Sequence, residues 1–396
     1  SERKDRNKRN CWLTYTNEKT HEIIRENIMR APKYAGKIHG IGARYCPSIE
    51  DKVVRFADKD RHQLFVEPEG LDTTEMYVQG MSTSMPIDVQ YAFLRTIPGF
   101  EDVKMMRPAY AIEYDLLDPL QLYPTLEVIK LPGLYSAGQS NGTSGYEEAA
   151  AQGLVAGINA ALKIQGKDPF ILARHEAYIG SLVDDLVTKG ADEPYRMMTS
   201  RSEYRLILRQ DNADLRLTEK GHSIGLVGEE RYARFLERKK KYEEAMDYIR
   251  TQRFTPKEEI NRALESMGTA PLTTGTGADQ ILKRPEMTYR KMMEILGCPS
   301  FDEEAVEEME ITVKYEGYIA RQEAAVRKAA RMENEKLPLD MDYLSLDGIS
   351  TEARQKMDKI RPLSLGQAAR IPGVSPADIS VLMVYVKQRK GKKGAE

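Results

Sequence analysis

The fold is decided by a glycine-rich stretch near the middle of the chain, Ala137-Gly138-Gln139-Ser140-Asn141-Gly142-Thr143-Ser144-Gly145-Tyr146-Glu147-Glu148. Its glycines permit positive φ angles and a close approach of a ligand to the backbone. The residues from Val128 to Ala137 are expected to form a strand or hairpin, and the small-residue run from Tyr146 to about Lys163 a helix. A strand, a tight loop and a helix in immediate succession are typical of an α/β fold.

This loop has a functional and a structural interpretation. The start of the following helix offers backbone N–H groups and the positive end of the helix dipole to an electron-rich ligand. A flavin ring edge is such a ligand, because reduction places negative charge near N1 and C2=O. Gly153 and Gly157 would let the helix pack tightly on a sheet. A tight turn with no ligand explains the same glycines equally well.

The residues before the loop mix short strands, helices and turns, as in an α/β or α+β domain. Strands are predicted at Cys11–Tyr15, Gln63–Glu67 and Met76–Met81, and helices within Asn17–Arg30 and Asp88–Thr96.

Beyond Pro169 the pattern is almost entirely helical. Long charged helices are predicted at Glu229–Thr251 and Val313–Glu335. Ser364 with Gln367 forms a capping-box pattern, and Ser375 with Pro376 and Asp378 marks another helix start.

Composition excludes several classes of protein. A length of 396 residues predicts two or three domains, and a net charge of −2 excludes a globally basic nucleic-acid binder. Three scattered cysteines without a Cys-x-x-Cys motif, and five unpaired histidines, indicate neither disulfides nor a metal site, and favour a reducing cytosol. Neither a signal peptide nor an apolar run of the roughly 18 residues needed for a membrane span is visible.

Arginines alternate with tyrosines in the segment 191–220. Arg201, Arg205 and Arg209 are four residues apart, so they would share one face if this segment were helical. Arginine and tyrosine together suit RNA phosphates and unstacked bases. The segment nevertheless contains as many acidic as basic residues, so a solvated, salt-bridged surface is the alternative.

Cys46 is a candidate nucleophile. Arg44, Lys52 and Arg55 are close in sequence and favour the thiolate, whereas Glu50 and Asp51 oppose it. A small buried side chain is the alternative, and it is the interpretation we prefer for Cys11 and Cys298.

Two long motifs resemble signatures of the MnmG (GidA) family, flavoproteins that modify the wobble uridine of tRNA: Ala137–Ala160, and Gly42–Phe56, where Ala43 replaces the usual proline. Further similarity lies in Thr14–His21, Pro194–Thr218 and Lys314–Gln322. The family's glycine-rich flavin-phosphate fingerprint would precede residue 1, and no Gly-x-Gly-x-x-Gly occurs here. The chain is therefore expected to be the carboxy-terminal two-thirds of a longer protein.

The resemblance implies a fold and a domain order. The fold class is α/β, a partial FAD/NAD-binding Rossmann-like portion with an inserted α/β domain, followed by an all-α C-terminal region. Residues 1–118 would be the inserted domain and residues 119–165 the returning part of the FAD-binding domain. Residues 166–311 would form a helical domain that contacts tRNA, and residues 312–396 a C-terminal helical domain that binds tRNA and a partner.

The resemblance also implies roles for residues. Gln139 matches a position that contacts FAD, within a loop whose other implied cofactor-binding residues are Gly138, Asn141, Gly142 and Gly145. The segment implied to bind NADH contributes Gly42, Arg44, Tyr45, Pro47, Ser48, Glu50, Asp51 and Lys52. Cys46 matches a required cysteine, whose thiolate would add to C6 of uracil and make C5 nucleophilic. Arg196 and Arg205 match positions implicated in tRNA binding.

The implied reaction uses NADH-reduced FAD and methylenetetrahydrofolate to add a carboxymethylaminomethyl or aminomethyl group to C5 of the wobble uridine. The implied enzyme is a cytoplasmic homodimer that binds the tRNA anticodon region and works with the GTPase MnmE. Two alternatives remain: a tRNA- and partner-binding module without catalytic activity, and a folate-dependent tRNA uracil methyltransferase of the TrmFO type. The long helical part beyond residue 166 argues against the TrmFO type.

Overall fold

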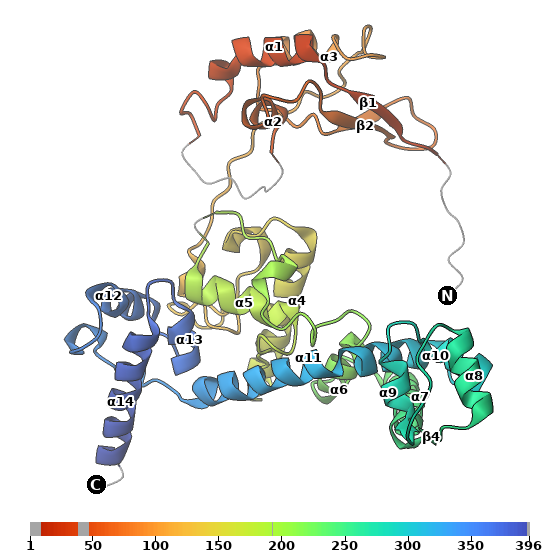
Figure 1. The fold of residues 1–396 in the computed structure, drawn as a ribbon. Helices are drawn as coiled ribbons and strands as arrows, with labels where there is room; N and C mark the ends of the chain where they lie inside the picture. Colours follow the sequence, from red (N-terminus) through yellow and green to blue (C-terminus); the bar gives the residue numbers. More distant parts are fainter. Residues whose placement is uncertain (1–8, 39–46, 192, 394–396) are drawn as a thin grey trace. The chain divides into compact units, whose positions relative to one another are not determined.

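The computed structural model describes residues 9–38, 47–191 and 193–393 (Figure 1). The chain divides into two compact units. The first unit comprises residues 1–122, 126–160 and 190–196. The second unit comprises residues 123–125, 161–189 and 197–396.

The first unit contains a three-stranded antiparallel sheet in the order β1 (Trp12–Tyr15), β2 (Gln63–Pro68) and β3 (Met76–Gln79). Three helices accompany the sheet: α1 (Glu18–Glu26), α2 (Ile49–Arg55) and α3 (Ile87–Leu94). Its core is formed by buried apolar side chains such as Ile24, Leu64 and Phe93. All three predicted strands and both predicted helices of this part are confirmed to within a few residues.

The glycine-rich stretch forms a short 3-10 turn, η3 (Gly138–Asn141), followed by α4 (Tyr146–Ile164), which confirms the predicted helix. The strand or hairpin predicted from Val128 to Ala137 is reduced to isolated bridges, Leu122 with Val128 and Glu127 with Tyr135. Gly153 and Gly157 are exposed, and no described residue outside α4 lies near a Cβ built on either. The expected tight packing of these glycines on a sheet is therefore not formed by the described residues.

The second unit is helical except for a small sheet of two paired strands, β4 (Arg253–Phe254) and β5 (Thr276–Gly277). Its main helices are α5 (Tyr178–Lys189), α6 (Ala213–Ser223), α7 (Glu229–Thr251), α8 (Glu258–Ser266), α9 (Ala278–Leu282), α10 (Tyr289–Leu296), α11 (Glu303–Asn334), α12 (Thr351–Ile360), α13 (Leu365–Arg370) and α14 (Pro376–Lys393). The predicted mixture of an α/β part and a helical C-terminal region is confirmed.

Helix caps explain two boundaries in the second unit. The long helix predicted from Val313 begins earlier, at Glu303, because the Asp302 side chain accepts a hydrogen bond from the backbone N–H of Ala305. α14 begins as predicted: the Ser375 hydroxyl accepts from the N–H of Asp378, whose carboxylate accepts from the N–H of Ser375.

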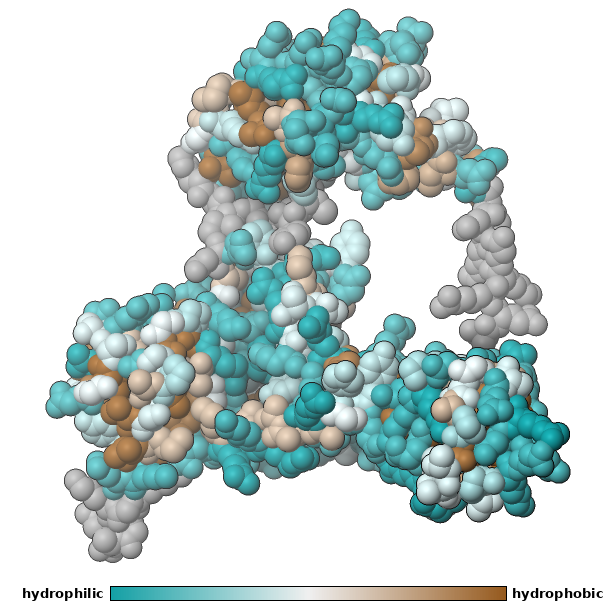
Figure 2. All heavy atoms as spheres, viewed as in Figure 1, coloured by the Kyte–Doolittle hydropathy of each residue, from teal (hydrophilic) through white to brown (hydrophobic). Residues whose placement is uncertain are grey.

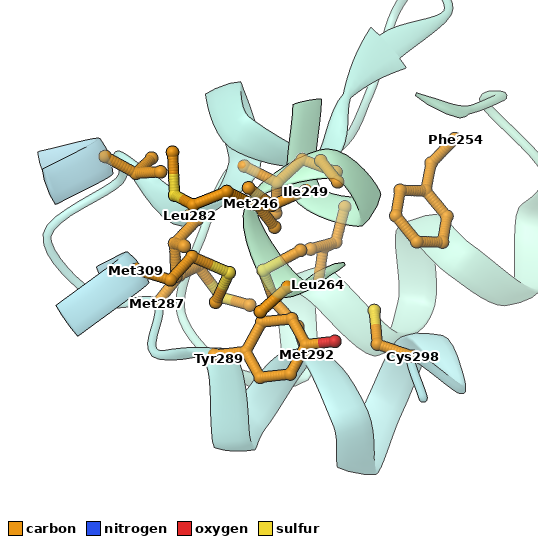
Figure 3. Close-up of a cluster of buried hydrophobic side chains, with 14 of the residues drawn as sticks. Met246, Ile249, Phe254, Leu264, Leu282, Met287, Tyr289, Met292, Cys298 and Met309 are labelled. Atoms are coloured by element: carbon orange, nitrogen blue, oxygen red, sulfur yellow. The ribbon is translucent and has the colours of Figure 1, made fainter. Parts of the chain in front are cut away.

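The second unit has two separate hydrophobic cores. The first lies among α7 to α11 and contains Met246, Ile249, Leu264, Tyr289 and Met309 (Figure 3). The visible surface over α7 to α10 is mainly hydrophilic (Figure 2), as burial of the apolar side chains in this core requires. The second core lies among α12 to α14 and includes Tyr343, Leu365 and Leu382.

None of the described helices combines the length and the apolar character that crossing a lipid bilayer would require. Among the residues that the structure describes, His, Cys, Asp and Glu side chains do not gather in groups of three or more that could hold a metal ion.

Candidate functional site

Hydrogen bonds among buried, neutral side chains hold the glycine loop in shape. The Asn141 amide is fully buried; its Nδ2 donates to the carbonyl oxygen of Ser136 (2.9 Å) and to Oε1 of Gln152 (2.9 Å). The Ser136 hydroxyl donates to Oδ1 of Asn141 (2.6 Å), and Nε2 of Gln152 donates to Oγ1 of Thr143 (2.6 Å). We call Ser136, Asn141, Thr143 and Gln152 the amide network. Because it satisfies its own polar atoms, the loop keeps its shape without a ligand.

Glycine is required in this loop for its backbone geometry. Gly138 and Gly142 have φ angles of +79° and +80°, which L side chains rarely adopt. A Cβ on Gly142 would also lie only 2.9 Å from the Cβ of Ala191.

The segment that ends at Arg196 lies against the glycine loop. The backbone N–H of Tyr195 donates to the carbonyl oxygen of Gly142 (2.9 Å). Nε of Arg196 lies 3.5 Å from Oε1 of Glu148, which is almost fully buried in the first turn of α4. A Cβ on Gly145 would clash with both the Glu148 carboxylate and the Arg196 guanidinium. The ion pair therefore occupies the space over Gly145, and glycine at this position makes room for it.

The residues present fit a flavin ring edge better than a phosphate. The carboxylates of Glu147 and Glu148 stand in the first turn of α4, where they already complement the helix dipole and would repel an anion. The Gln139 side chain is exposed and makes no hydrogen bond with a described residue, so its amide can reach a ligand. The Asn141 side chain is occupied by the amide network, which leaves its backbone for a ligand contact.

Three of the eight residues predicted to bind NADH, Gly42, Arg44 and Tyr45, lie outside the described residues, together with the predicted nucleophile Cys46. Pro47 is exposed, and Ser48 caps α2 by accepting from the N–H of Asp51. The Glu50 carboxylate is buried, where its Oε1 accepts from both the backbone N–H and the hydroxyl of Ser84.

Asp51 is held by residues that the sequence did not indicate. Its Oδ1 accepts from Nζ of Lys33 (2.8 Å) and from the Tyr34 hydroxyl (2.9 Å). Burial alone would raise the pKa of Asp51, but these hydrogen bonds and the Lys33 charge lower it below its usual value. Burial and the same carboxylate raise the pKa of Tyr34 to about 12. Lys52 donates to the carbonyl oxygen of Gly80 (3.3 Å), so the described polar side chains of this segment fix α2 within the first unit.

The arginine-rich segment, residues 197–209, is not a helix. It contains the 3-10 turn η4 (Thr199–Arg201) followed by irregular turns. The conditional expectation that Arg201, Arg205 and Arg209 share a helical face is therefore wrong. Arg209 is half-buried and pairs with Asp211 (2.9 Å) and Glu308 (2.6 Å), whereas Arg205 is exposed and forms no ion pair with a described residue.

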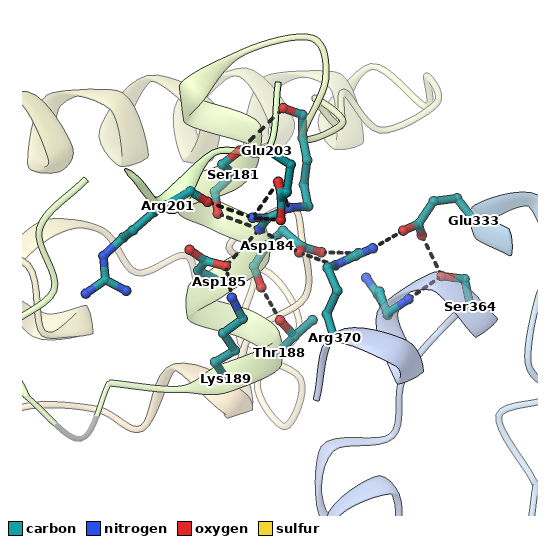
Figure 4. A network of polar contacts seen from close by, with 12 residues as sticks. Ser181, Asp184, Asp185, Thr188, Lys189, Arg201, Glu203, Glu333, Ser364 and Arg370 are labelled. Atoms are coloured by element: carbon teal, nitrogen blue, oxygen red, sulfur yellow. Dashed lines mark hydrogen bonds and ion pairs between the residues drawn. The ribbon is translucent and has the colours of Figure 1, made fainter. Parts of the chain in front are cut away.

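A buried set of charges holds this segment in place (Figure 4). Arg174 is almost fully buried and donates to Asp184 (3.1 Å), Asp185 (2.7 Å), Glu203 (2.9 Å) and the carbonyl oxygen of Arg201 (3.1 Å). Burial alone would lower the pKa of Arg174, but the carboxylates around it raise the pKa above its usual value, so the guanidinium stays charged.

The same charges extend to the C-terminal bundle. Arg370 of α13 donates to both carboxylate oxygens of Asp184 (2.7 Å each) and also pairs with Glu333 at the end of α11. Glu333 in turn accepts from the Ser364 hydroxyl (2.6 Å). We call Arg174, Asp184, Asp185, Glu203, Glu333 and Arg370 the charge network. The sequence did not indicate it, because its members are up to 196 positions apart, from Arg174 to Arg370.

Gln322 of α11 holds the segment from its other side. Its Oε1 accepts from the N–H of Leu206 (3.1 Å), and its Nε2 donates to the carbonyl oxygen of Glu203 (3.1 Å). Arg205 lies between these two bonded residues, so its backbone is fixed while its side chain is left in solvent.

Comparison with known proteins places this fold and loop in one family. Residues 1–168 match the family described as glucose inhibited division protein A. Residues 229–323 match the C-terminal helical domain of the tRNA modifying enzyme MnmG/GidA, and residues 325–396 match its C-terminal helical bundle. The chain belongs to the MnmG/GidA family.

The sequences of individual relatives match nearly the whole of this chain. It is 57% identical over 385 residues to the tRNA uridine 5-carboxymethylaminomethyl modification enzyme MnmG of Caldicellulosiruptor saccharolyticus, covering 97% of this chain and 62% of that protein. The MnmG of Enterococcus faecalis is 57% identical over 388 residues, covering 98% and 61%. The structure of Aquifex aeolicus GidA in its form II crystal matches with a TM-score of 0.81 at 46% identity, covering 97% and 60%. The chain thus spans about three-fifths of the length of these relatives.

Proposed function

We propose that this chain is part of an enzyme that modifies the wobble uridine of tRNA, with a flavin bound at the glycine loop. The observation that carries the proposal is the contact between the loop and the segment ending at Arg196, through the Tyr195–Gly142 hydrogen bond and the Arg196–Glu148 ion pair. A residue expected to bind RNA therefore touches the loop expected to bind the cofactor. The names of the relatives support the same substrate and reaction.

In this proposal the loop residues Gly138, Gln139, Asn141, Gly142 and Gly145 hold FAD. When bound, the NADH-reduced flavin would supply the redox chemistry for transfer of a one-carbon unit from methylenetetrahydrofolate to C5, where glycine or ammonium would contribute the amine nitrogen. The amide network keeps the loop in one shape, so no ordering of the backbone is needed when the ring binds. Gln139 orients the ring edge through its free amide.

Other residues of the chain bind the reductant and the RNA. The segment from Gly42 to Phe56 is proposed to bind NADH through Gly42, Arg44, Tyr45, Pro47, Ser48, Glu50, Asp51 and Lys52. Glu50 and Asp51 would act by fixing α2. The Cys46 thiolate is proposed to add to C6 of the uracil and make C5 nucleophilic. Arg196 and Arg205 are proposed to bind phosphates of the anticodon region. The working enzyme is proposed to be a cytoplasmic homodimer that acts with the GTPase MnmE.

A second candidate function is a module that binds tRNA and a protein partner without catalysis. It is favoured by one observation: no Gly-x-Gly-x-x-Gly motif occurs in the chain, although FAD phosphates are commonly held by such a motif. The two candidates differ in whether the glycine loop alone retains a flavin.

The test is the visible absorption spectrum of the protein after incubation with FAD and desalting. We expect retained flavin bands in the wild type and weaker bands in Gln139→Leu, with Gln165→Leu, exposed in the turn after α4, as the matched control. A colourless wild-type protein would favour the binding module. Nucleoside analysis of tRNA from a deficient strain complemented by the parent protein tests the reaction: an unmodified wobble uridine would refute it.

A further inference from the structure

The middle of α11 presents aromatic side chains to solvent. Tyr315 and Tyr318 are 47% and 56% exposed, with their ring centroids 6.5 Å apart. The Arg321 guanidinium lies 5.2 Å from the centroid of the Tyr318 ring. Neither tyrosine belongs to the hydrophobic cores at the two ends of the helix. Packing of the described residues therefore does not account for these side chains.

The same turn of α11 holds the arginine-rich segment. Gln322, next to Arg321, binds backbone groups of Glu203 and Leu206, and Arg205 lies between those two residues. Arg205 and the exposed rings are thus carried by neighbouring stretches of backbone. The two stretches are joined by two hydrogen bonds of 3.1 Å each.

Two arginines contribute positive charge to this surface. Arg205 and Arg321 are exposed, and neither forms an ion pair within the described part of the chain. The acids beside them are already matched: Glu316 by Lys283 (2.6 Å), Glu323 by Arg327 (3.8 Å) and Glu203 by Arg174 (2.9 Å). Arg321 therefore leaves a positive charge over the Tyr318 ring, and Arg205 carries a second one on the stretch of chain that Gln322 binds.

Unpaired RNA has the chemistry that such a surface recognises. Bases that are not stacked in a helix stack on tyrosine rings or on guanidinium planes, and arginines take the adjoining phosphates. Tyrosine and arginine are also enriched at protein interfaces, so a protein partner is an outcome that the test below distinguishes.

We propose that Tyr318, Arg321 and Tyr315 form a stacking platform for unpaired bases of the tRNA anticodon loop, and that Arg205 binds an adjoining phosphate. The inference rests on the proposed function and adds the residues that read the single-stranded part of the substrate. Gln322 is a positioning residue, since it fixes the Arg205 backbone against the helix turn that carries the rings.

The experiment measures binding of a fluorescein-labelled anticodon stem-loop RNA by anisotropy over a range of salt concentrations. Tyr318→Leu, which removes the ring and keeps an apolar side chain, is expected to weaken binding about tenfold without changing the salt dependence. Tyr318→Phe should bind like wild type. Arg205→Gln should lower the slope of log affinity against log salt by about 0.7, the value for one phosphate contact in a single strand.

Matched controls are Tyr110→Leu, an exposed tyrosine of the first unit, and Arg327→Gln, a paired arginine of α11; both should bind nearly as wild type. A loop base replaced by 2-aminopurine should change its fluorescence on binding to wild type and not to Tyr318→Leu. If Tyr318→Leu binds normally while Arg205→Gln is weakened, the platform is refuted and the proposed function stands. If wild type binds no RNA, the platform and the RNA part of the proposed function both fail, and nucleoside analysis decides the reaction independently. Protection of Tyr318 only by a protein partner would also refute the platform.

Discussion

The glycine loop of the first unit and the arginine-rich segment of the second are both irregular, yet different chemistry fixes them. Buried hydroxyls and amides hold the loop, and every member of its amide network is neutral. Carboxylates and guanidinium groups hold the arginine-rich segment, with Arg174 at the centre. A neutral network gives a fixed shape that pH and salt change little, whereas a charged one responds to any ion that competes for its members. This difference suits the roles proposed for the two regions, cofactor binding and RNA binding respectively.

The largest effect is expected from disrupting the charge network of the second unit. Arg174→Met removes a nearly buried cation that Asp184, Asp185 and the half-exposed Glu203 share; Arg370 and Lys189 stay paired with the two aspartates, and the free energy of unfolding should fall by about 3–5 kcal/mol. Urea denaturation measures it, because urea adds no ions. Arg389→Met, which removes an exposed pair with Asp340, is the control and should cost no more than about 1 kcal/mol. Equal effects of the two changes would show that the charge network is not structural.

Disrupting the amide network should lower the free energy of unfolding by somewhat less. Gln152→Leu leaves the buried Asn141 amide and Thr143 hydroxyl each without one partner, so the first unit should lose about 2–4 kcal/mol. The same urea titration, followed by amide exchange in residues 136–152, reports it. Gln165→Leu is exposed and should change stability by less than about 0.5 kcal/mol. The loss should be the same in low and high salt, and a strong salt dependence would contradict a neutral network.

The stability of the second unit should also depend on pH, through Glu308, which pairs with Arg209 of the arginine-rich segment. Burial, with the hydrogen bond that the protonated Glu308 donates to the Asp211 carboxylate, raises the pKa of Glu308 to about 8, although the Arg209 charge lowers it. Between its unfolded pKa of 4.5 and about 8, the unfolded chain ionises this group while the folded protein keeps it protonated. The contribution of Glu308 to the free energy of unfolding should therefore be greatest below pH 4.5 and fall as pH rises through this window. Glu308→Gln should flatten the profile.

The control for this measurement is Glu307→Gln, an exposed neighbour on the same helix. It should leave the slope of unfolding free energy against pH unchanged. A wild-type profile that rises between pH 5 and 8 while Glu308→Gln keeps the same slope would show that Glu308 is ionised in the folded protein.

The smallest expected effect concerns the ion pair between Arg196 and Glu148, beside the glycine loop. Glu148→Gln removes the charge that Arg196 pairs with, and this partly exposed pair should contribute less than about 1 kcal/mol. Amide exchange of residues 142–148 should accelerate by no more than about fivefold. Glu147→Gln, exposed in the same turn, should have no such effect. Slower exchange in Glu148→Gln would mean that the pair strains the loop instead of holding it.

Local features of the molecule could be predicted from the sequence. α4, α7 and α14 lie where their caps and periodicity indicate, because those signals come from residues within one or two turns. The start of α11 was placed too late because its cap, Asp302, precedes a run of charged residues with little apolar periodicity.

Contacts between distant residues could not be predicted. The bond from Tyr195 to Gly142 and the pair of Lys33 with Asp51 leave no pattern in spacing. The helical interpretation of the arginine-rich segment failed for the same reason. Arg174 and Gln322 bind the backbone of Arg201, Glu203 and Leu206, and these tertiary contacts outweigh local periodicity.

The length of α11 has a mechanical consequence. Its 32 residues form a rod of roughly 48 Å, anchored near one end by Met309 in the first core and near the other by Met332 against the second (Figure 1). The two anchors are 23 residues apart, about 35 Å of helix, so a tilt of one degree at one anchor displaces the other by about 0.6 Å. That displacement is large compared with the tolerance of a hydrogen bond such as the one between Ser364 and Glu333. A small rotation in the methionine-rich core would thus be enough to make or break contacts of the C-terminal bundle.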